Sequence, residues 1–265
     1  MALPAQQIVS MRLRPSLLLV LTLAACRDRT PSANPTVTVT VAAAASLQEV
    51  VTELDSLYAV EHPDVVVRAT FGASGAVRQQ IEQGAPVDVF ISASDRHVDA
   101  LQKAGLVDAR SRRAFAGNAL VLIVPATAGS NVRGFRDLAS PAVRRVAIGA
   151  AASVPAGEYA EQVLRSLGIA QAVAAKAVFA QNVRQVLAYV ERGEVDAGIV
   201  YRTDVRASRR VRAVAEAPPA THAPITYPLV LVSRRPHPEE ARAYAAFLLG
   251  PRGREVLARR GFTVP

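Results

Sequence analysis

Tryptophan is absent from this 265-residue chain, and aromatic residues make up only 5% of it. Cysteine occurs once, at Cys26, so no disulfide can form within the chain. The few histidines, the one cysteine and the carboxylates show no spacing typical of a metal site. The scarcity of aromatic side chains also argues against a platform that stacks nucleic-acid bases. We therefore expect neither bound metal cations nor nucleic acid.

Lysine is nearly absent as well. The formal net charge of +9 comes almost wholly from arginine, because lysine occurs only at Lys103 and Lys176. The arginines are scattered along the chain, and their densest run lies within 206–212. Such a run is typical of a solvated face, and attraction of anions or docking to a partner is the alternative.

One apolar run stands near the N-terminus. Two arginines, Arg12 and Arg14, precede an apolar segment over 16–25 that is too short to span a bilayer as a mature helix. It ends in Leu23-Ala24-Ala25-Cys26, which resembles the lipobox of bacterial lipoproteins. We expect a signal peptide over 1–25, lipid on Cys26 and a tether over 26–35, which would anchor a periplasmic or cell-envelope domain to a membrane. An ordinary secretory signal with an unmodified cysteine is the alternative.

Beyond residue 35, predicted strands and helices alternate. Strands are expected over 37–43, 65–71, 87–91, 120–124, 143–148, 174–179, 197–200 and 225–232. Helices are expected after Ser46, from Ser74 to Gln83, over 96–104, from about Ala156 to Leu167, from Val183 to Gly193, over 238–249 and over 251–259. This order implies mostly parallel sheets covered by helices, and about 230 residues suffice for two lobes.

Four predicted helices begin where a strand or turn ends, at Ser46, Ser74, Ala156 and Val183. Ligands of such sheets bind at the carboxyl ends of the strands. The first N–H groups of a helix lack partners within it, and its dipole adds partial positive charge there. A buried strand carries Tyr201 to the same edge. The pattern predicts a cage of hydrogen-bond donors for a small oxyanion.

Each of these residues also has a purely structural interpretation. Ser46, with Glu49 three residues later, fits a capping box at the start of a helix. Ser74 fits a turn, and Tyr201 fits the surface end of a strand. The prediction of a site rests on their equivalent positions at strand ends rather than on any one of them.

The sequence does not favour catalysis. A Gly-x-Ser-x-Gly nucleophile elbow is absent, and Gly72-Ala73-Ser74-Gly75 lacks the required spacing. The four histidines, His62, His97, His222 and His237, stand in loop or helix-start contexts typical of solvated side chains. We therefore predict a binding protein and not an enzyme. An exported hydrolase and a sensor domain of the same fold are the alternatives.

Five short segments carry a resemblance to a known family. They are Ala43-Ala44-Ala45-Ser46-Leu47, Gly84-Ala85-Pro86-Val87-Asp88-Val89-Phe90-Ile91-Ser92-Ala93, Val154-Pro155-Ala156-Gly157, Asn182-Val183-Arg184 and Gly198-Ile199-Val200-Tyr201. They occur in the order found in the molybdate-binding proteins of ABC transporters, which the chain resembles from about Val37 to Phe262.

This resemblance implies an α/β, two-lobed periplasmic-binding-protein-like fold of type II, in which each lobe is a mostly parallel sheet flanked by helices. Two chain crossovers would divide it into lobe 1 (36–118 plus 228–265) and lobe 2 (119–227). The site implied for the tetrahedral dianion consists of the hydroxyls of Ser46, Ser74 and Tyr201 and the N–H groups of Ser46, Ser74, Ala156 and Val183. The resemblance further implies a monomer that needs no cofactor and delivers molybdate or tungstate to an ABC permease.

A site built only of donors also selects by protonation. Phosphate near neutral pH carries a proton that needs an acceptor, and none of the candidate groups is a carboxylate. Sulfate satisfies the same requirement as molybdate and is the alternative ligand.

The chain departs from the family pattern at three places. Ala73 and Gly75 flank Ser74 where a serine-rich turn is usual, so a neighbouring hydroxyl is lost. Asn182 stands where aspartate is common, which removes a negative charge near the anion. Glu158 lies in the first turn of its helix, and we expect it to point to solvent.

Overall fold

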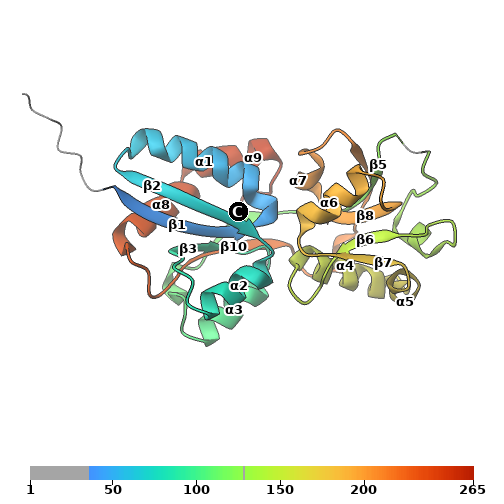
Figure 1. Cartoon of the computed structure of the whole chain (residues 1–265), viewed down its shortest axis with the longest axis horizontal. Helices are drawn as coiled ribbons and strands as arrows, with labels where there is room; N and C mark the ends of the chain where they lie inside the picture. Colours follow the sequence, from blue (N-terminus) through green and yellow to red (C-terminus); the bar gives the residue numbers. More distant parts are fainter. Residues whose placement is uncertain (1–35, 128) are drawn as a thin grey trace, which may run out of the picture. The chain divides into compact units, whose positions relative to one another are not determined.

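The computed structural model describes residues 36–127 and 129–265, which belong to one compact unit (Figure 1). The predicted signal peptide, lipidation at Cys26 and tether all lie outside the described residues. Within the described ranges, no helix is both long and apolar enough to span a membrane.

Two five-stranded mixed sheets form the framework of this unit. The first has the order β2-β1-β3-β10-β4 and the second the order β7-β6-β8-β5-β9. The first contains β1 (Val37–Ala44), β2 (Val65–Gly72), β3 (Val89–Ile91), β4 (Arg113–Gly117) and β10 (Thr226–Leu231). The second contains β5 (Leu120–Pro125), β6 (Val146–Gly149), β7 (Ala177–Ala180), β8 (Ala197–Tyr201) and β9 (Val211–Glu216).

One strand in each sheet runs against the other four. It is β10 in the first sheet and β5 in the second, and both are antiparallel to their two neighbours. The remaining pairs are parallel. The predicted α/β class with two mostly parallel sheets is therefore confirmed. We call the part built on the first sheet lobe 1 and the part built on the second sheet lobe 2.

The chain passes between the lobes twice, from β4 to β5 and from β9 to β10. The antiparallel strand of each sheet is thus the strand that enters from the other lobe. The second crossover was expected at 227/228, but β10 begins at Thr226, and Tyr227 already pairs with β4 of lobe 1.

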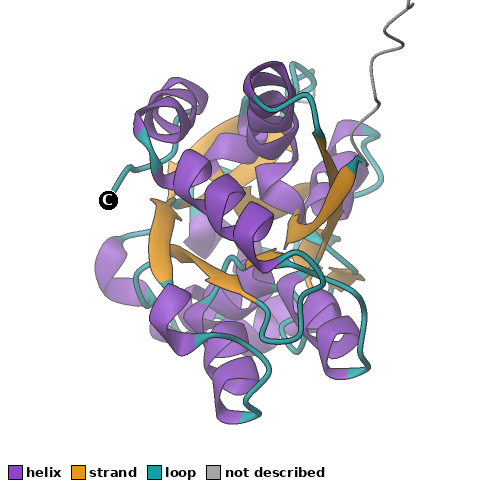
Figure 2. Ribbon diagram, turned by 90° about the vertical axis from the view of Figure 1, so that its left-hand side faces the viewer, coloured by secondary structure: helices purple, strands orange, loops and turns teal. Residues whose placement is uncertain are grey.

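Helices cover both faces of each sheet (Figures 1 and 2). Lobe 1 contains α1 (Gln48–Glu61), α2 (Ser74–Glu82), α3 (Asp95–Lys103), α8 (Pro238–Leu249) and α9 (Pro251–Arg260), and lobe 2 contains α4 (Pro155–Ser166), α5 (Ala170–Ala174), α6 (Val183–Glu191) and α7 (Arg202–Val205). Val41 and Ala42 of the interior strand β1 point to opposite faces and join different apolar clusters. Strand β1 therefore has apolar packing on both faces and a paired strand on each side.

The start of α1 differs from the prediction. A single 3₁₀ turn over Ala45–Leu47 follows β1, and α1 begins only at Gln48. Neither Ser46 nor its neighbours provide a side-chain cap, so the capping box expected from Ser46 and Glu49 is wrong. The extra turn places Ser46 at the end of the strand, where its buried hydroxyl meets groups from distant parts of the chain.

Candidate functional site

All five residues predicted to bind an anion line one pocket. Ser46 and Ser74 come from lobe 1, whereas Ala156, Val183 and Tyr201 come from lobe 2. The other lining residues are Ala44, Ala45, Gly72, Ala73, Ala93, Val154, Pro155 and Asn182. The cavity that these atoms enclose is small, about 10 Å³ measured for the centre of a water-sized sphere. A more spacious hollow at the edge of lobe 2, around 129–143 and 191–196, includes none of the five residues.

Three helix starts contribute residues to the wall of this pocket. Ser74 is the first residue of α2, Val183 is the first of α6, and Ala156 is the second of α4, after Pro155. N–H groups in these first turns have no acceptor within their own helix. Asn182 caps α6 as predicted, since its side chain accepts the N–H of Gln185 at 2.9 Å. Each lobe therefore contributes backbone donors and helix dipoles of the sign that suits an anion.

A glycine pair brings the start of α4 close to the sheet. A Cβ atom on Gly157 would lie 1.9 Å from the carbonyl oxygen of Gly149 at the end of β6. No side chain fits there, and so α4 can approach β6 backbone to backbone. This packing sets the position of the neighbouring N–H of Ala156 at the pocket wall.

The two serines are buried, and each side-chain oxygen has a hydrogen-bond partner in the folded chain. The Oγ of Ser74 accepts the N–H of Ala93 at 2.9 Å. The Oγ of Ser46 lies 3.0 Å from the hydroxyl of Tyr227, a residue that we did not single out from the sequence. No local signal links Ser46 to Tyr227, because 181 positions separate them.

Tyr201 presents a buried phenol that has no partner in the described part of the chain. Its side chain is 1% exposed, and its hydroxyl makes no hydrogen bond with residues 36–127 or 129–265. Burial raises the pKa of Tyr201 well above its usual range, so the hydroxyl keeps its proton. An unpartnered buried hydroxyl costs about 1–3 kcal/mol. Its place in the pocket wall therefore favours a ligand that accepts this proton.

No charged side chain appears among the lining residues. Glu158, expected to point to solvent, is instead only 24% exposed and pairs across the lobes with Arg96, with 3.2 Å between Oε2 and Nε. Burial raises the pKa of Glu158, and the positive charge of Arg96 opposes that shift. The carboxylate therefore neither enters the pocket nor faces water freely, because a cation from the other lobe holds it.

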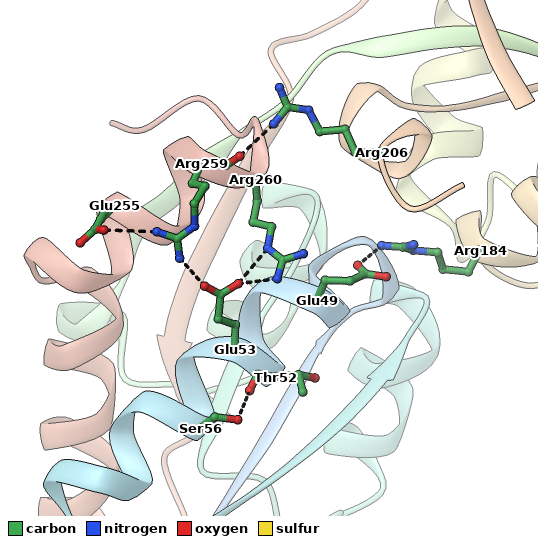
Figure 3. Close-up of polar contacts among 9 residues, drawn as sticks. All are labelled: Glu49, Thr52, Glu53, Ser56, Arg184, Arg206, Glu255, Arg259 and Arg260. Atoms are coloured by element: carbon green, nitrogen blue, oxygen red, sulfur yellow. Dashed lines mark hydrogen bonds and ion pairs between the residues drawn. The ribbon is translucent and has the colours of Figure 1, made fainter. Parts of the chain in front are cut away.

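Polar contacts join the lobes beside the pocket (Figure 3). Arg184, which follows Val183 in α6, pairs with Glu49 of α1. Arg206 of lobe 2 donates to the carbonyl oxygen of Arg259 at 2.9 Å, and Glu53 of α1 pairs with the Arg259 side chain. Helix α1 thus contacts lobe 2 directly through Glu49 and steadies the end of α9 through Glu53.

A second group of contacts closes the opposite side. The N–H of Gly75 donates to the carbonyl oxygen of Ser153 at 2.9 Å, and the Arg96 guanidinium donates to the carbonyl oxygen of Ala151 at 3.2 Å. These contacts require the two lobes to lie against each other. The structure is therefore that of the closed state.

His97 is the histidine that departs from the prediction of solvated side chains. It is buried beside Gly75, and burial lowers its pKa to about 4, helped by Arg96 and Arg78. Its ring is therefore neutral near pH 7. The described residues contain no group of three or more His, Cys, Asp or Glu side chains placed to hold a metal ion.

Comparison with known proteins places these features in a family. The family model of bacterial extracellular solute-binding proteins matches residues 39–263. The putative ABC transporter substrate-binding lipoprotein YvgL of Bacillus subtilis is 38% identical over 83% of this chain and 84% of its own length. The molybdate-binding protein ModA of Haemophilus influenzae is 33% identical over 83% of this chain and 88% of its own length.

A solved structure gives the same result. The substrate-binding domain of a putative molybdenum ABC transporter from Clostridium difficile has a TM-score of 0.67 and 36% identity, and covers 86% of this chain and 99% of that one. The matched residues 39–263 agree with the stretch from about Val37 to Phe262 over which the sequence resembles the molybdate-binding family. The chain therefore belongs to the bacterial extracellular solute-binding proteins, and its resemblance to the molybdate-binding proteins of ABC transporters is confirmed.

Proposed function

We propose that the protein binds molybdate or tungstate in the pocket between its lobes and delivers the anion to an ABC importer. The named molybdate-binding and molybdenum-transporter relatives support both the ligand and the transport system. The observation that carries the proposal is one pocket lined by donors from both lobes and by no charged side chain. Membership of a solute-binding family also confirms the prediction of binding rather than catalysis.

The donors that we assign to the ligand are the hydroxyls of Ser46, Ser74 and Tyr201 together with the N–H groups of Ser46, Ser74, Ala156 and Val183. Hydrogen bonds to an ionised group contribute roughly 1.5–3 kcal/mol each, so six or seven of them sum to about 10–20 kcal/mol. Association and lobe closure reduce this sum. A dissociation constant between about 1 μM and 1 nM is then reachable without an arginine or lysine in the pocket.

Donor-only walls favour a fully deprotonated tetrahedral dianion. Hydrogen phosphate carries a proton for which none of the assigned groups is a good acceptor. Sulfate meets the same chemical requirement as molybdate and differs mainly in size, so it is the second candidate ligand. The anion is cargo, and the proposal assigns no cofactor to the protein.

We also assign the protein to the cell envelope, as a monomer tethered by lipid on Cys26 to the membrane that holds the permease. The Bacillus subtilis relative is named a lipoprotein, which supports this assignment. Mass spectrometry of the protein from membranes should detect a diacylglyceryl-modified Cys26 at the new N-terminus. Release of an unmodified, soluble protein would reject the anchor but not the transport function.

The experiment that tests the function is calorimetric titration of the soluble domain with molybdate, tungstate, sulfate and phosphate at pH 7. We expect submicromolar binding of the first two anions, weaker binding of sulfate and the weakest binding of phosphate. A folded protein that releases no heat with molybdate or tungstate but binds sulfate would establish the alternative ligand. Absence of binding to all four would reject the proposal.

A further inference from the structure

Asn118 stands at the first crossover between the lobes, and its side chain makes three hydrogen bonds. Its Oδ1 accepts the N–H of Ala119 at 2.9 Å, which fixes the amide oxygen on that side. Its Nδ2 therefore faces the other way, and donates to the Thr203 Oγ1 at 2.9 Å and to the Tyr227 hydroxyl at 3.2 Å. Both amide protons are used, and the amide orientation follows from the backbone partner.

The hydrogen bond from Asn118 also determines which way the Tyr227 hydroxyl donates. The Tyr227 side chain is fully buried, and burial raises the pKa of its hydroxyl, so the proton stays on it. An amide nitrogen such as Nδ2 of Asn118 cannot accept a hydrogen bond. The single proton of Tyr227 is therefore directed to its other partner, the Oγ of Ser46 at 3.0 Å.

Ser46 then keeps its own proton for an acceptor other than Tyr227. Its Oγ already accepts from Tyr227 behind the pocket, and its side chain lines the pocket in front. The Ser74 Oγ also accepts a hydrogen bond from the protein, in this case from the backbone N–H of Ala93. Both hydroxyls thus accept one hydrogen bond from the protein, and each keeps its own proton for an acceptor in the pocket.

We propose that Asn118 and Tyr227 are positioning residues that orient the Ser46 hydroxyl as a donor to the ligand and thereby disfavour protonated anions at this position. The inference rests on the proposed function of the pocket. A free serine hydroxyl can rotate and accept the proton of hydrogen phosphate. Here the relay from Asn118 through Tyr227 to Ser46 opposes that rotation, because a Ser46 hydroxyl that accepted from an incoming P–O–H group would leave its own proton without a ligand oxygen to receive it.

The first test is the ratio of the dissociation constants for phosphate and molybdate, measured by competition titration at pH 7. Tyr227→Phe frees the Ser46 hydroxyl to rotate, and we expect molybdate binding to weaken about 3- to 10-fold. Phosphate binding should weaken less or improve, so that the ratio falls by about 10-fold. Tyr244→Phe is the matched control: it also removes a buried tyrosine hydroxyl of lobe 1, one bonded to Asp55 outside the pocket, and should leave the ratio unchanged.

The second test reverses the relay. In Asn118→Asp the carboxylate accepts the proton of Tyr227, so the Tyr227 oxygen accepts from Ser46, and Ser46 presents a lone pair to the pocket. The added negative charge should weaken the binding of every anion, but the ratio of the phosphate and molybdate dissociation constants should fall further than in Tyr227→Phe. This variant also keeps the inference testable if Tyr227→Phe does not fold.

A double-mutant cycle separates the relay from a general structural role. If Tyr227 acts through Ser46, then Tyr227→Phe should not change the ratio in a Ser46→Ala background. An additive change there, or an unchanged ratio in both Tyr227→Phe and Asn118→Asp, overturns the inference. Failure of the wild-type protein to bind molybdate would instead reject the proposed function, so the two failures are distinguishable.

Discussion

At the scale of single residues, Tyr201 and Ser74 make different contributions although both hydroxyls line the pocket. The Tyr201 hydroxyl has no partner among the described residues, whereas the Ser74 oxygen accepts the N–H of Ala93. Loss of the first hydroxyl therefore affects only a ligand. Loss of the second also leaves a buried backbone donor without its acceptor, which is a cost that the folded protein bears with or without ligand.

Tyr201→Phe should weaken molybdate binding without weakening the protein. We expect the dissociation constant to rise about 5- to 150-fold, equivalent to about 1–3 kcal/mol, because one hydrogen bond to the anion is lost. The melting temperature of the ligand-free protein should not fall. Calorimetric titration and thermal unfolding check both parts, with Ser74→Ala as the comparison, which should weaken binding and also lower the melting temperature. Unchanged affinity in both variants would show that the site is misplaced.

Asp55 links stability to pH. Burial raises its pKa from 3.8 to about 6, although the hydrogen bond from Tyr244 acts in the opposite direction. Between about pH 4 and pH 6 the folded state therefore binds more protons than the unfolded state, so the free energy of unfolding falls as the pH rises through this window. Burial also raises the pKa of Asp204 to about 6, and its effect on the free energy of unfolding has the same sign.

His97, whose pKa burial lowers to about 4, acts in the opposite direction. We therefore predict a difference between variants: from pH 4.5 to pH 7 the melting temperature of Asp55→Asn should rise relative to that of the wild type. The asparagine cannot ionise but still offers an oxygen to the Tyr244 hydroxyl. Thermal unfolding across the pH range measures the effect. A difference between the two melting temperatures that stays constant across this range would show that Asp55 does not carry the linkage.

Sequence reasoning reached part of the site at this scale. Ser46, Ser74 and Tyr201 could be singled out because each stands at the end of a predicted strand. Tyr227 could not, because its role depends on a contact with Ser46 that only the folded chain creates. The same limit explains Glu158: its position in a first helical turn suggested solvent, but Arg96 of the other lobe holds it.

At the scale of elements, local signals succeeded where they were strong. Helix α8 has the predicted bounds, and α9 extends one residue further, because each begins with a proline and α9 ends at Gly261 in a left-handed conformation. Edge strands β4 and β9 were missed. They pair on one side only, and polar residues such as Arg212 and Glu216 interrupt the apolar pattern of β9.

Gly157→Ala should impair the pocket through the position of α4. The new methyl group would meet the carbonyl oxygen of Gly149 at 1.9 Å, and backbone on both sides leaves little room to adjust. Helix α4 must then move away from β6 and take the N–H of Ala156 with it. We expect molybdate affinity to fall at least about 10-fold and the melting temperature to drop, since overpacking costs about 1–3 kcal/mol. Calorimetric titration and thermal unfolding measure these changes.

Gly134→Ala is the matched control in the same lobe. No atom lies within 4 Å of a Cβ at this position, and its backbone is extended, so an alanine fits without strain. Its affinity should equal that of the wild type. Equal affinity in Gly157→Ala as well would show that the close approach of α4 does not set the site.

At the scale of the whole described unit, ligand binding and lobe closure are linked. The proposed ligand groups come from both lobes, as do the contacts of Arg184 with Glu49 and of Gly75 with Ser153. A ligand that bridges the lobes stabilises the closed state over the open one by its differential affinity. The alternating strand and helix pattern predicted mostly parallel sheets, and the family resemblance implied two lobes. The residues that touch when the lobes close follow no sequence period.

Gly75→Ala should impair closure of the lobes without destabilising the folded, ligand-free protein. A Cβ atom at Gly75 would lie 2.6 Å from Cα and 2.7 Å from the carbonyl oxygen of Ser153 in the other lobe. Within its own lobe the nearest atom is Cε1 of His97 at 3.0 Å, which a small shift of the ring relieves. Opening the lobes removes the larger clash altogether, and alanine favours the helical conformation of α2 over glycine by about 1 kcal/mol. The ligand-free variant should therefore be at least as stable as the wild type.

Binding by this variant should nevertheless weaken at least about 10-fold, because the closed state that the anion requires is the state in which the methyl group clashes. Small-angle X-ray scattering gives the direct readout: molybdate should reduce the radius of gyration of the wild type and of Gly134→Ala, but not that of Gly75→Ala. Wild-type affinity together with normal compaction in Gly75→Ala would contradict the prediction, since it would mean that α2 and the loop at Ser153 do not meet when the ligand is bound. Weak binding with a lowered ligand-free melting temperature would instead locate the damage inside lobe 1, beside His97.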